Sequence, residues 1–246
     1  MALALWLLPQ AAAPASGRWV VSVASSLEPA LREAAAIWPD AGATGQPLLN
    51  AAASGLLLQQ IRRGAPADLL LAASPLEIDR LVDDGLADRG SRRAIASNRL
   101  VAVAGCDGPT ARRLDDLPGA AIDRIAVANV RTAPLGRYTR QALEAAGLWE
   151  RLEDRLIFAE SARQALDYVA RGEAPLGIVY RTDARLLADR LCVAFELPPE
   201  LHDPVVYEGV VLRDATRPAE ARAFLDWLTT DGGRAVLARH GFLPPP

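Results

Sequence analysis

Short apolar runs alternate along this chain with amphipathic stretches of helical period, and this alternation limits the fold more than any other feature. The runs are rich in β-branched residues or leucine, as buried strands are. Strands separated by helices are typical of α/β folds, in which largely parallel sheets are flanked by helices. We expect strands at residues 19–23, 47–50, 68–72, 99–104, 124–128, 155–158, 176–180, 191–196 and 205–212.

The intervening stretches have the period of amphipathic helices. Residues 27–38 place Leu27, Leu31 and Trp38 on one stripe, and residues 161–171 place Ala162, Ala165, Leu166 and Val169 on another. Residues 218–239 are expected to form two helices with a break at Gly232-Gly233, because paired glycines interrupt helices.

Composition excludes several classes of function. The chain has 246 residues and is 51% hydrophobic, which suffices for one large or two small domains. A formal charge of −3 argues against a nucleic-acid partner, since backbone phosphates require a concentrated excess of basic groups. The chain contains no lysine, so Schiff-base chemistry, a Ser-Lys dyad and a P-loop lysine are impossible.

Residues 1–18 differ from the rest of the sequence. A short apolar block, MALALWLL, is followed by Pro9 and a stretch of small residues with the character of a cleavage site. The block is too short to span a bilayer, and we expect an export leader, although no positive residue precedes it.

The rarer reactive residues give few further indications. Cys106 and Cys192 form a disulfide or are two small buried apolar residues, and the sequence does not decide between these alternatives. His202 and His240 have no metal-ligand spacing, so no metal site with protein side-chain ligands is predicted.

Two serines lie where an expected strand gives way to an expected helix. Ser26 follows the strand at 19–23, and Ser54 follows the strand at 47–50. A helix start offers unpaired backbone N–H groups and the positive end of the helix dipole, and a serine adds a hydroxyl donor. Each junction is therefore a candidate anion site without a cationic side chain. The alternative is that each serine simply caps its helix.

Six segments occur in a fixed order along the chain, and RHGF (239–242) closes the series. The segments are VASSL (23–27), AASG (52–55), RGAPADL (63–69), APLGRY (133–138), AESARQAL (159–166) and APLGIVY (174–180). Together they resemble the periplasmic molybdate-binding proteins of ABC importers, which are type II periplasmic binding proteins. The resemblance runs from about Trp19 to Phe242.

The resemblance implies a two-lobe fold with the oxyanion enclosed in the cleft between the lobes. Carried onto this chain, it gives a first lobe of residues 19–103 plus 206–246 and a second lobe of residues 104–205. It also implies a periplasmic monomer, exported by the leader in residues 1–18, that works with the permease and ATPase subunits of an importer.

The resemblance assigns five residues to the ligand. The hydroxyl and N–H groups of Ser26 and Ser54 come from the first lobe, and the N–H groups of Leu135 and Ala162 and the hydroxyl of Tyr180 come from the second. Leu135 stands where a small residue is common in the family, and Ala162 stands where valine is common. For Tyr180 the alternative is an aromatic side chain packed at a strand end with its hydroxyl in water.

The chemistry of these groups fits molybdate. Molybdate at neutral pH is a tetrahedral dianion without a proton, so it only accepts hydrogen bonds. Phosphate also carries a proton, which a pocket made only of donors leaves unpaired. Tungstate, with nearly the same size and charge, is expected to bind about as well, and sulfate is separated from these ions only by size.

Alternative functions were weighed against this prediction. An enzyme would need an activated nucleophile, and the chain has no Gly-x-Ser-x-Gly segment. The effector domain of a transcription regulator would need a DNA-binding helix-turn-helix, for which the leader and the acidic balance of the chain leave no room. A protein that binds a small organic acid would need an arginine in the cleft, and we expect Arg137 and Arg163 to be exposed in the first turns of helices. Ser25, in place of a frequent alanine, is expected to cap the first helix.

Overall fold

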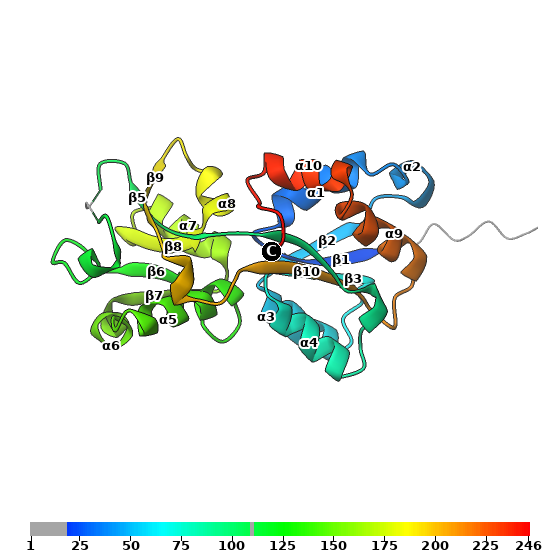
Figure 1. The fold of residues 1–246 in the computed structure, drawn as a ribbon, viewed down its shortest axis with the longest axis horizontal. Helices are drawn as coiled ribbons and strands as arrows, with labels where there is room; N and C mark the ends of the chain where they lie inside the picture. The colour runs from blue at the N-terminus through cyan, green and yellow to red at the C-terminus, as the bar shows by residue number, and fades with distance from the viewer. Residues whose placement is uncertain (1–18, 109–110) are drawn as a thin grey trace, which may run out of the picture.

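A computed structural model describes residues 19–108 and 111–246 and contains two lobes, each built on a five-stranded sheet flanked by helices (Figure 1). The expected leader, residues 1–18, lies outside the described residues. The α/β fold with two lobes is confirmed.

The sheet of the first lobe has the strand order β2-β1-β3-β10-β4. Parallel pairs join β1 to β2 and to β3, and β10 runs antiparallel to both of its neighbours, β3 and β4. The bounds are β1 (Val20–Ala24), β2 (Leu48–Ala52), β3 (Leu69–Ala72), β4 (Arg93–Ser97) and β10 (Val206–Val211).

The sheet of the second lobe repeats this plan with the order β7-β6-β8-β5-β9. Here β6 pairs in parallel with β7 and β8, while β5 runs antiparallel to β8 and β9. The bounds are β5 (Leu100–Gly105), β6 (Ile125–Ala128), β7 (Leu156–Ala159), β8 (Leu176–Tyr180) and β9 (Leu191–Glu196). In each sheet one strand opposes the direction of the other described strands, so both sheets are mixed but mostly parallel.

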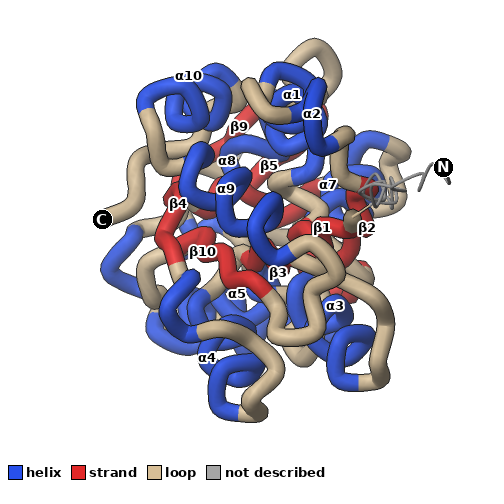
Figure 2. The backbone as a smooth tube through the Cα atoms, turned by 90° about the vertical axis from the view of Figure 1, so that its right-hand side faces the viewer, coloured by secondary structure: helices blue, strands red, loops and turns tan. Residues whose placement is uncertain are grey.

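Helices cover both faces of each sheet (Figures 1 and 2). On the first sheet, α3 (Ser54–Arg62) and α4 (Pro75–Asp83) lie opposite α1 (Glu28–Ile37), α9 (Pro218–Leu228) and α10 (Asp231–Arg239), with α2 (Ala41–Thr44) beside α1. On the second, α7 (Ala162–Ala170) and α8 (Arg181–Arg185) lie opposite α5 (Pro134–Ala145) and α6 (Trp149–Leu152). Single 3₁₀ turns occur at Arg89–Ser91, Leu114–Asp116, Glu153–Arg155 and Pro199–Leu201.

An aromatic cluster joins the two ends of the chain in the first lobe. The Trp19 ring lies 5.7 Å from the Phe224 ring and 5.9 Å from the Trp38 ring, and all three side chains are buried. Edge-to-face pairs of this kind add roughly 0.5 to 1.5 kcal/mol each beyond the burial of their apolar area. The cluster explains why the first lobe takes its helices from both ends of the sequence.

The chain crosses between the lobes at two places. The first crossing is at residues 98–99, between β4 and β5, and the second is the segment between β9 and β10. β5 pairs along its length with β8, from Leu100 opposite Tyr180 to Ala104 opposite Leu176. The predicted division at residues 103 and 104 therefore falls inside a strand of the second lobe, and strand pairing puts the crossing earlier.

The nine predicted strands all appear, but β4 was not predicted. Its sequence, RAIAS, contains one large apolar residue, Ile95, because β4 is an edge strand whose other side chains are half-exposed or small. The predicted helix break at Gly232-Gly233 is wrong: α9 ends at Leu228, and both glycines lie in α10. A Cβ at Gly233 would lie 2.5 Å from the Leu228 Cα, so glycine there lets α10 pack closely on the end of α9.

Cys106 and Cys192 form a disulfide, with their Cα atoms 4.9 Å apart. It ties the end of β5 to the beginning of β9, which are neighbours in the second sheet. The alternative of two free buried cysteines is wrong. Within the two described ranges, no helix is long and apolar enough to cross a membrane.

Candidate functional site

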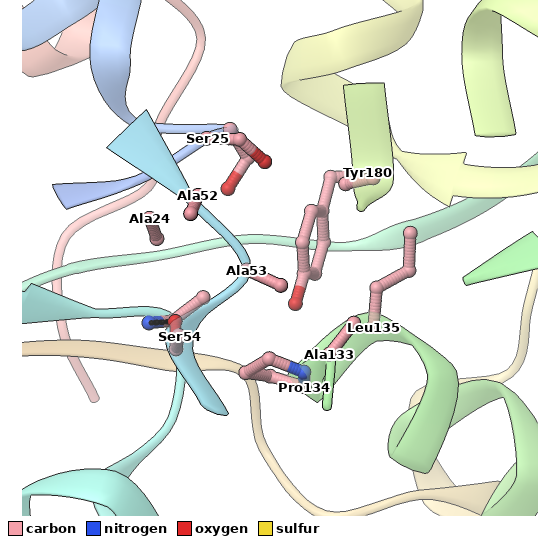
Figure 3. Close-up of a pocket in the computed structure, with 12 residues that line it drawn as sticks. Ala24, Ser25, Ala52, Ala53, Ser54, Ala133, Pro134, Leu135 and Tyr180 are labelled. Atoms are coloured by element: carbon pink, nitrogen blue, oxygen red, sulfur yellow. Dashed lines mark hydrogen bonds between the residues drawn. The ribbon is translucent and has the colours of Figure 1, made fainter. Parts of the chain in front are cut away.

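A small pocket lies where the two lobes meet, and residues of both lobes line it (Figure 3). The cavity is small, with a volume of about 10 Å³. All five residues predicted to contact a ligand lie in its wall. The lining residues are Ala24, Ser25, Ser26, Ala52, Ala53, Ser54, Ala73, Ala133, Pro134, Leu135, Ala162 and Tyr180.

Ser26 lies in the turn between β1 and α1 and is almost fully buried. Its hydroxyl lies 2.8 Å from the hydroxyl of Tyr207, in β10. No side chain caps α1, so capping is wrong for Ser26, and it is also wrong for Ser25, which lines the pocket. The Ser26 hydroxyl thus contacts a second hydroxyl, and Ser26 forms part of the pocket wall.

Ser54 is the first residue of α3 and is 1% exposed. Its Oγ accepts a hydrogen bond of 3.0 Å from the Ala73 N–H, and no side chain caps α3. Because the backbone N–H occupies a lone pair of Oγ, the hydroxyl hydrogen remains available for donation. Ser54 is therefore arranged as a donor toward the pocket.

Tyr180 ends β8, and its hydroxyl points into the pocket (Figure 3). The side chain is 1% exposed, and its Oη is buried without a hydrogen-bond partner. The alternative of a hydroxyl in water is wrong. Burial raises the pKa of Tyr180 well above its usual value, so the phenol keeps its proton and remains a donor. An unpaired buried hydroxyl costs about 1 to 3 kcal/mol, which a ligand oxygen would offset.

Leu135 and Ala162 lie in the first turns of α5 and α7. The first N–H groups of a helix have no acceptor within the helix. Pro134 begins α5 and has no N–H, so the N–H of Leu135 is the first donor of that helix. The Leu135 side chain is 1% exposed and packs in the core, so it forms pocket wall.

Among the residues that the structure describes, no charged side chain lines the pocket. Arg137 is not exposed as predicted: it reaches across the cleft from α5 and pairs with Glu77 of α4 at 2.7 Å. Arg163 is half-buried and lies 3.7 Å from Asp183 of α8. Both arginines are engaged by carboxylates outside the pocket, so its character comes from hydroxyls, helix N-termini and apolar walls.

The lobes touch on the side of the pocket formed by α3 and α4. The Gly55 N–H donates to the Thr132 carbonyl at 2.9 Å, and the Arg137–Glu77 ion pair spans the same cleft. A Cβ on residue 55 would lie 2.5 Å from the Thr132 oxygen, so only glycine permits this approach. These contacts describe a closed arrangement of the two lobes.

Two residues behind the pocket were missed. Tyr207 contacts Ser26, and Asn98 contacts Tyr207 from the first crossing segment. A strand tyrosine and an asparagine between two strands carry no local signal of this role. Only the three-dimensional arrangement brings them within reach of a serine more than 70 positions away.

Residues 20–243 match a family model described as bacterial extracellular solute-binding protein. The chain belongs to this family. This solute-binding protein is 31% identical over 233 residues to the molybdate-binding protein ModA of Haemophilus influenzae. The aligned region covers 93% of this chain and 91% of that protein.

Solved structures show the same fold. The periplasmic molybdate-binding protein of Azotobacter vinelandii superposes with a TM-score of 0.83 at 25% identity and covers 93% of this chain and all of that one. The sulfate-binding protein SubI of Mycobacterium tuberculosis H37Rv gives a TM-score of 0.76 at 18% identity, over 93% of this chain and 87% of that one, which shows the fold alone. The solute-binding protein is thus a binding protein and not an enzyme.

Proposed function

We propose that this protein captures molybdate, and also tungstate, and delivers it to an ABC importer. The observation that carries the proposal is that uncharged donors from both lobes surround one pocket. Ser26 and Ser54 come from the first lobe, and Leu135, Ala162 and Tyr180 come from the second. These five residues would bind the oxygens of the ion.

The donor set suits a dianion that carries no proton. Fixed hydroxyls and helix N-termini replace the ion's water shell without any neutralising cation. Each hydrogen bond to a charged ligand contributes roughly 1.5 to 3 kcal/mol. After the costs of dehydration and lobe closure, five or more give about −8 to −12 kcal/mol, which is micromolar to nanomolar affinity.

A small organic acid and sulfate are the two rival ligands. A small organic acid would be bound by an arginine fork, and the engagement of Arg137 with Glu77 and of Arg163 with Asp183 argues against one. Sulfate has the charge and proton count of molybdate, so only cavity size separates the two. The molybdate-binding relative at 31% identity supports molybdate as the first choice.

The proposal includes a cellular setting. The family description places its members outside the cytoplasm. We propose periplasmic localisation, export by the leader in residues 1–18, and delivery by a monomer to the permease and ATPase subunits of the importer.

Isothermal titration calorimetry with molybdate, tungstate, sulfate and phosphate tests the proposal. We expect similar, tight binding of the first two, weaker binding of sulfate and the weakest binding of phosphate. A ligand that binds the folded state also raises the melting temperature, which gives an independent readout. Binding confined to sulfate or to organic acids would replace molybdate with that ligand.

A further inference from the structure

A chain of buried hydrogen bonds leads from the pocket to the first crossing between the lobes. The Ser26 Oγ lies 2.8 Å from the Tyr207 Oη, and the Asn98 Nδ2 lies 3.3 Å from the same phenol oxygen. Asn98, Tyr207 and Ser26 are at most 4% exposed. Asn98 precedes β5, and Tyr207 lies near the start of β10, so both sit beside the crossings.

Backbone geometry sets the direction of this chain. The Arg99 N–H donates to the Asn98 Oδ1 at 2.9 Å, which fixes the orientation of the amide. The amide nitrogen then faces Thr182 Oγ1, at 2.8 Å, and Tyr207. An amide NH₂ group only donates, so the Tyr207 oxygen is an acceptor in this bond.

Tyr207 consequently has its own proton to place. Burial raises the pKa of Tyr207 above its usual value, so the phenol stays protonated. Within the described residues, Ser26 is the remaining hydrogen-bond partner of the phenol. If Ser26 donated to Tyr207, the phenol proton would be buried without an acceptor, which is costly. Tyr207 therefore donates to the Ser26 Oγ, and the Ser26 proton is left for the pocket.

We infer that Asn98 and Tyr207 are positioning residues that hold the Ser26 hydroxyl as a donor and so make the pocket select oxyanions that carry no proton. The inference rests on the proposed function and extends it to the source of selectivity. Ser54 is held in the same sense by another group, since the Ala73 N–H donates to its Oγ. Each serine Oγ thus already accepts one hydrogen bond and keeps its hydroxyl hydrogen for donation to the ligand.

Substitution Asn98→Asp reverses the chain with almost no change in shape. A carboxylate accepts from Arg99 and from the Tyr207 hydroxyl, so Tyr207 accepts from Ser26 and Ser26 turns a lone pair toward the ligand. At pH 8, phosphate is mainly a dianion with one proton, whereas molybdate is a dianion with none. The new negative charge therefore repels both ions about equally, and their affinity ratio isolates the hydrogen-bond direction.

The measurement is the ratio of the phosphate and molybdate dissociation constants, by calorimetry at pH 8. We expect Asn98→Asp to lower this ratio by roughly tenfold or more. Tyr207→Phe removes the link and frees the Ser26 hydroxyl, so it should lower the ratio by a smaller factor. In the Tyr207→Phe background, Asn98→Asp should have no further effect on the ratio, because the chain is already cut.

The outcomes are distinguishable. If Asn98→Asp keeps the unaltered protein's ratio while its ligand-free melting temperature shows a folded protein, the inference is wrong. Equal effects of Asn98→Asp with and without Tyr207 also overturn it. If Asn98→Asp does not fold, the ratio in Tyr207→Phe decides. If the unaltered protein binds sulfate instead of molybdate, the same ratio is taken with sulfate. An unaltered protein that binds none of the three ions refutes the proposed function, and the inference falls with it.

Discussion

The Ser54 Oγ accepts one hydrogen bond, which anchors it, and its hydroxyl hydrogen remains free to donate. Ser54→Ala removes both, so the Ala73 N–H also loses its partner. We expect molybdate affinity to fall roughly tenfold or more and the free energy of unfolding to fall by about 1 to 2 kcal/mol. Calorimetry and thermal unfolding measure the two effects.

Ser91 provides a matched control in the same lobe. It is also buried, and its Oγ accepts from the Val211 N–H at 2.9 Å, but it does not line the pocket. Ser91→Ala should lower stability by a similar amount and leave binding unchanged. Equal dissociation constants for Ser54→Ala and the unaltered protein would show that Ser54 has no part in binding.

Tyr180→Phe should lower affinity without lowering stability, whereas Ser54→Ala should lower both. The Tyr180 hydroxyl is buried without a partner. Without ligand, Tyr180→Phe should therefore leave the free energy of unfolding unchanged or raise it by up to about 1 kcal/mol, and the melting temperature should not fall. Molybdate affinity should fall roughly tenfold, because the ligand loses a donor. Tyr168→Phe, on the half-buried side of α7, is the control. Unchanged affinity in Tyr180→Phe would contradict the role of its hydroxyl.

Five residues of the pocket wall were predictable from the sequence, whereas Ser25 was assigned to helix capping and Tyr207 and Asn98, behind the pocket, were missed. Ser26 and Ser54 follow strands at helix starts, a local pattern that the sequence displays, and the six ordered segments of the family resemblance supplied Leu135, Ala162 and Tyr180. Tyr207 and Asn98 act through contacts 181 and 109 positions apart, between Ser26 and Tyr207 and between Asn98 and Tyr207. Arg137 was misjudged for the same reason, since its partner Glu77 lies 60 positions away.

At the scale of elements, α7 and α8 are joined by a buried carboxylate. Asp183 is fully buried, neither of its oxygens has a hydrogen bond, and Arg163 of α7 lies 3.7 Å away. Burial raises the pKa of Asp183 from 3.8 to about 6, and Arg163 opposes this shift only in part. The folded state therefore holds this proton more tightly than the unfolded state does.

This raised pKa has a defined effect on stability. Between pH 4 and 6 the unfolded chain releases the proton first, so the stability contributed by Asp183 is present below pH 4 and lost as the pH rises to about 6. Asp183→Asn should remove this loss and raise the free energy of unfolding at pH 8 by about 2 to 3 kcal/mol, with a much smaller gain at pH 4. Thermal melts at both pH values test this, with exposed Asp189→Asn as the control. A gain that does not depend on pH would contradict the assignment.

α5 and α4 are joined across the cleft by the Arg137–Glu77 ion pair. Glu77 is 0% exposed, so Arg137→Met leaves a buried carboxylate without a counter-ion when the lobes are closed. The open arrangement hydrates Glu77 again, so the equilibrium should shift toward it, and affinity for molybdate should fall several-fold to tenfold.

Calorimetry and small-angle X-ray scattering test the role of this pair. Arg140→Met is the matched control, because Arg140 lies on the same helix and pairs with Glu144 on the exposed surface. It should change neither affinity nor the radius of gyration. Equal affinities for Arg137→Met and the unaltered protein would show that the ion pair does not favour closure.

Secondary structure was predicted well where local pattern decides it and poorly where packing does. Strands with several apolar residues, such as β3 and β8, were identified because burial on both faces gives continuous apolar runs. β4 was missed because an edge strand needs few apolar residues, and it is held by pairing with β10. The α9–α10 boundary was misplaced because a glycine pair in a sequence usually indicates a helix break. Here Gly233 instead allows α10 to pack closely on the end of α9.

At the scale of the whole molecule, two similar lobes meet around a pocket to which each contributes donors. Both lobes line the pocket, so binding of a solute there would be linked to closure of the lobes. Asn98 and Tyr207 lie beside the two crossings and contact each other behind Ser26. The proposed orientation of the Ser26 hydroxyl therefore depends on the segments that connect the lobes. The proposed function depends on uncharged groups of both lobes that together bind one bare oxyanion in this pocket.

A crystal structure of the molybdate complex, with the metal located by its anomalous scattering, tests this claim most directly. We expect one molybdenum peak in the pocket, with the hydroxyls of Ser26, Ser54 and Tyr180 and the N–H groups of Leu135 and Ala162 within hydrogen-bond distance of its oxygens. A peak elsewhere, or an ion held by an arginine side chain or by one lobe alone, would contradict the account.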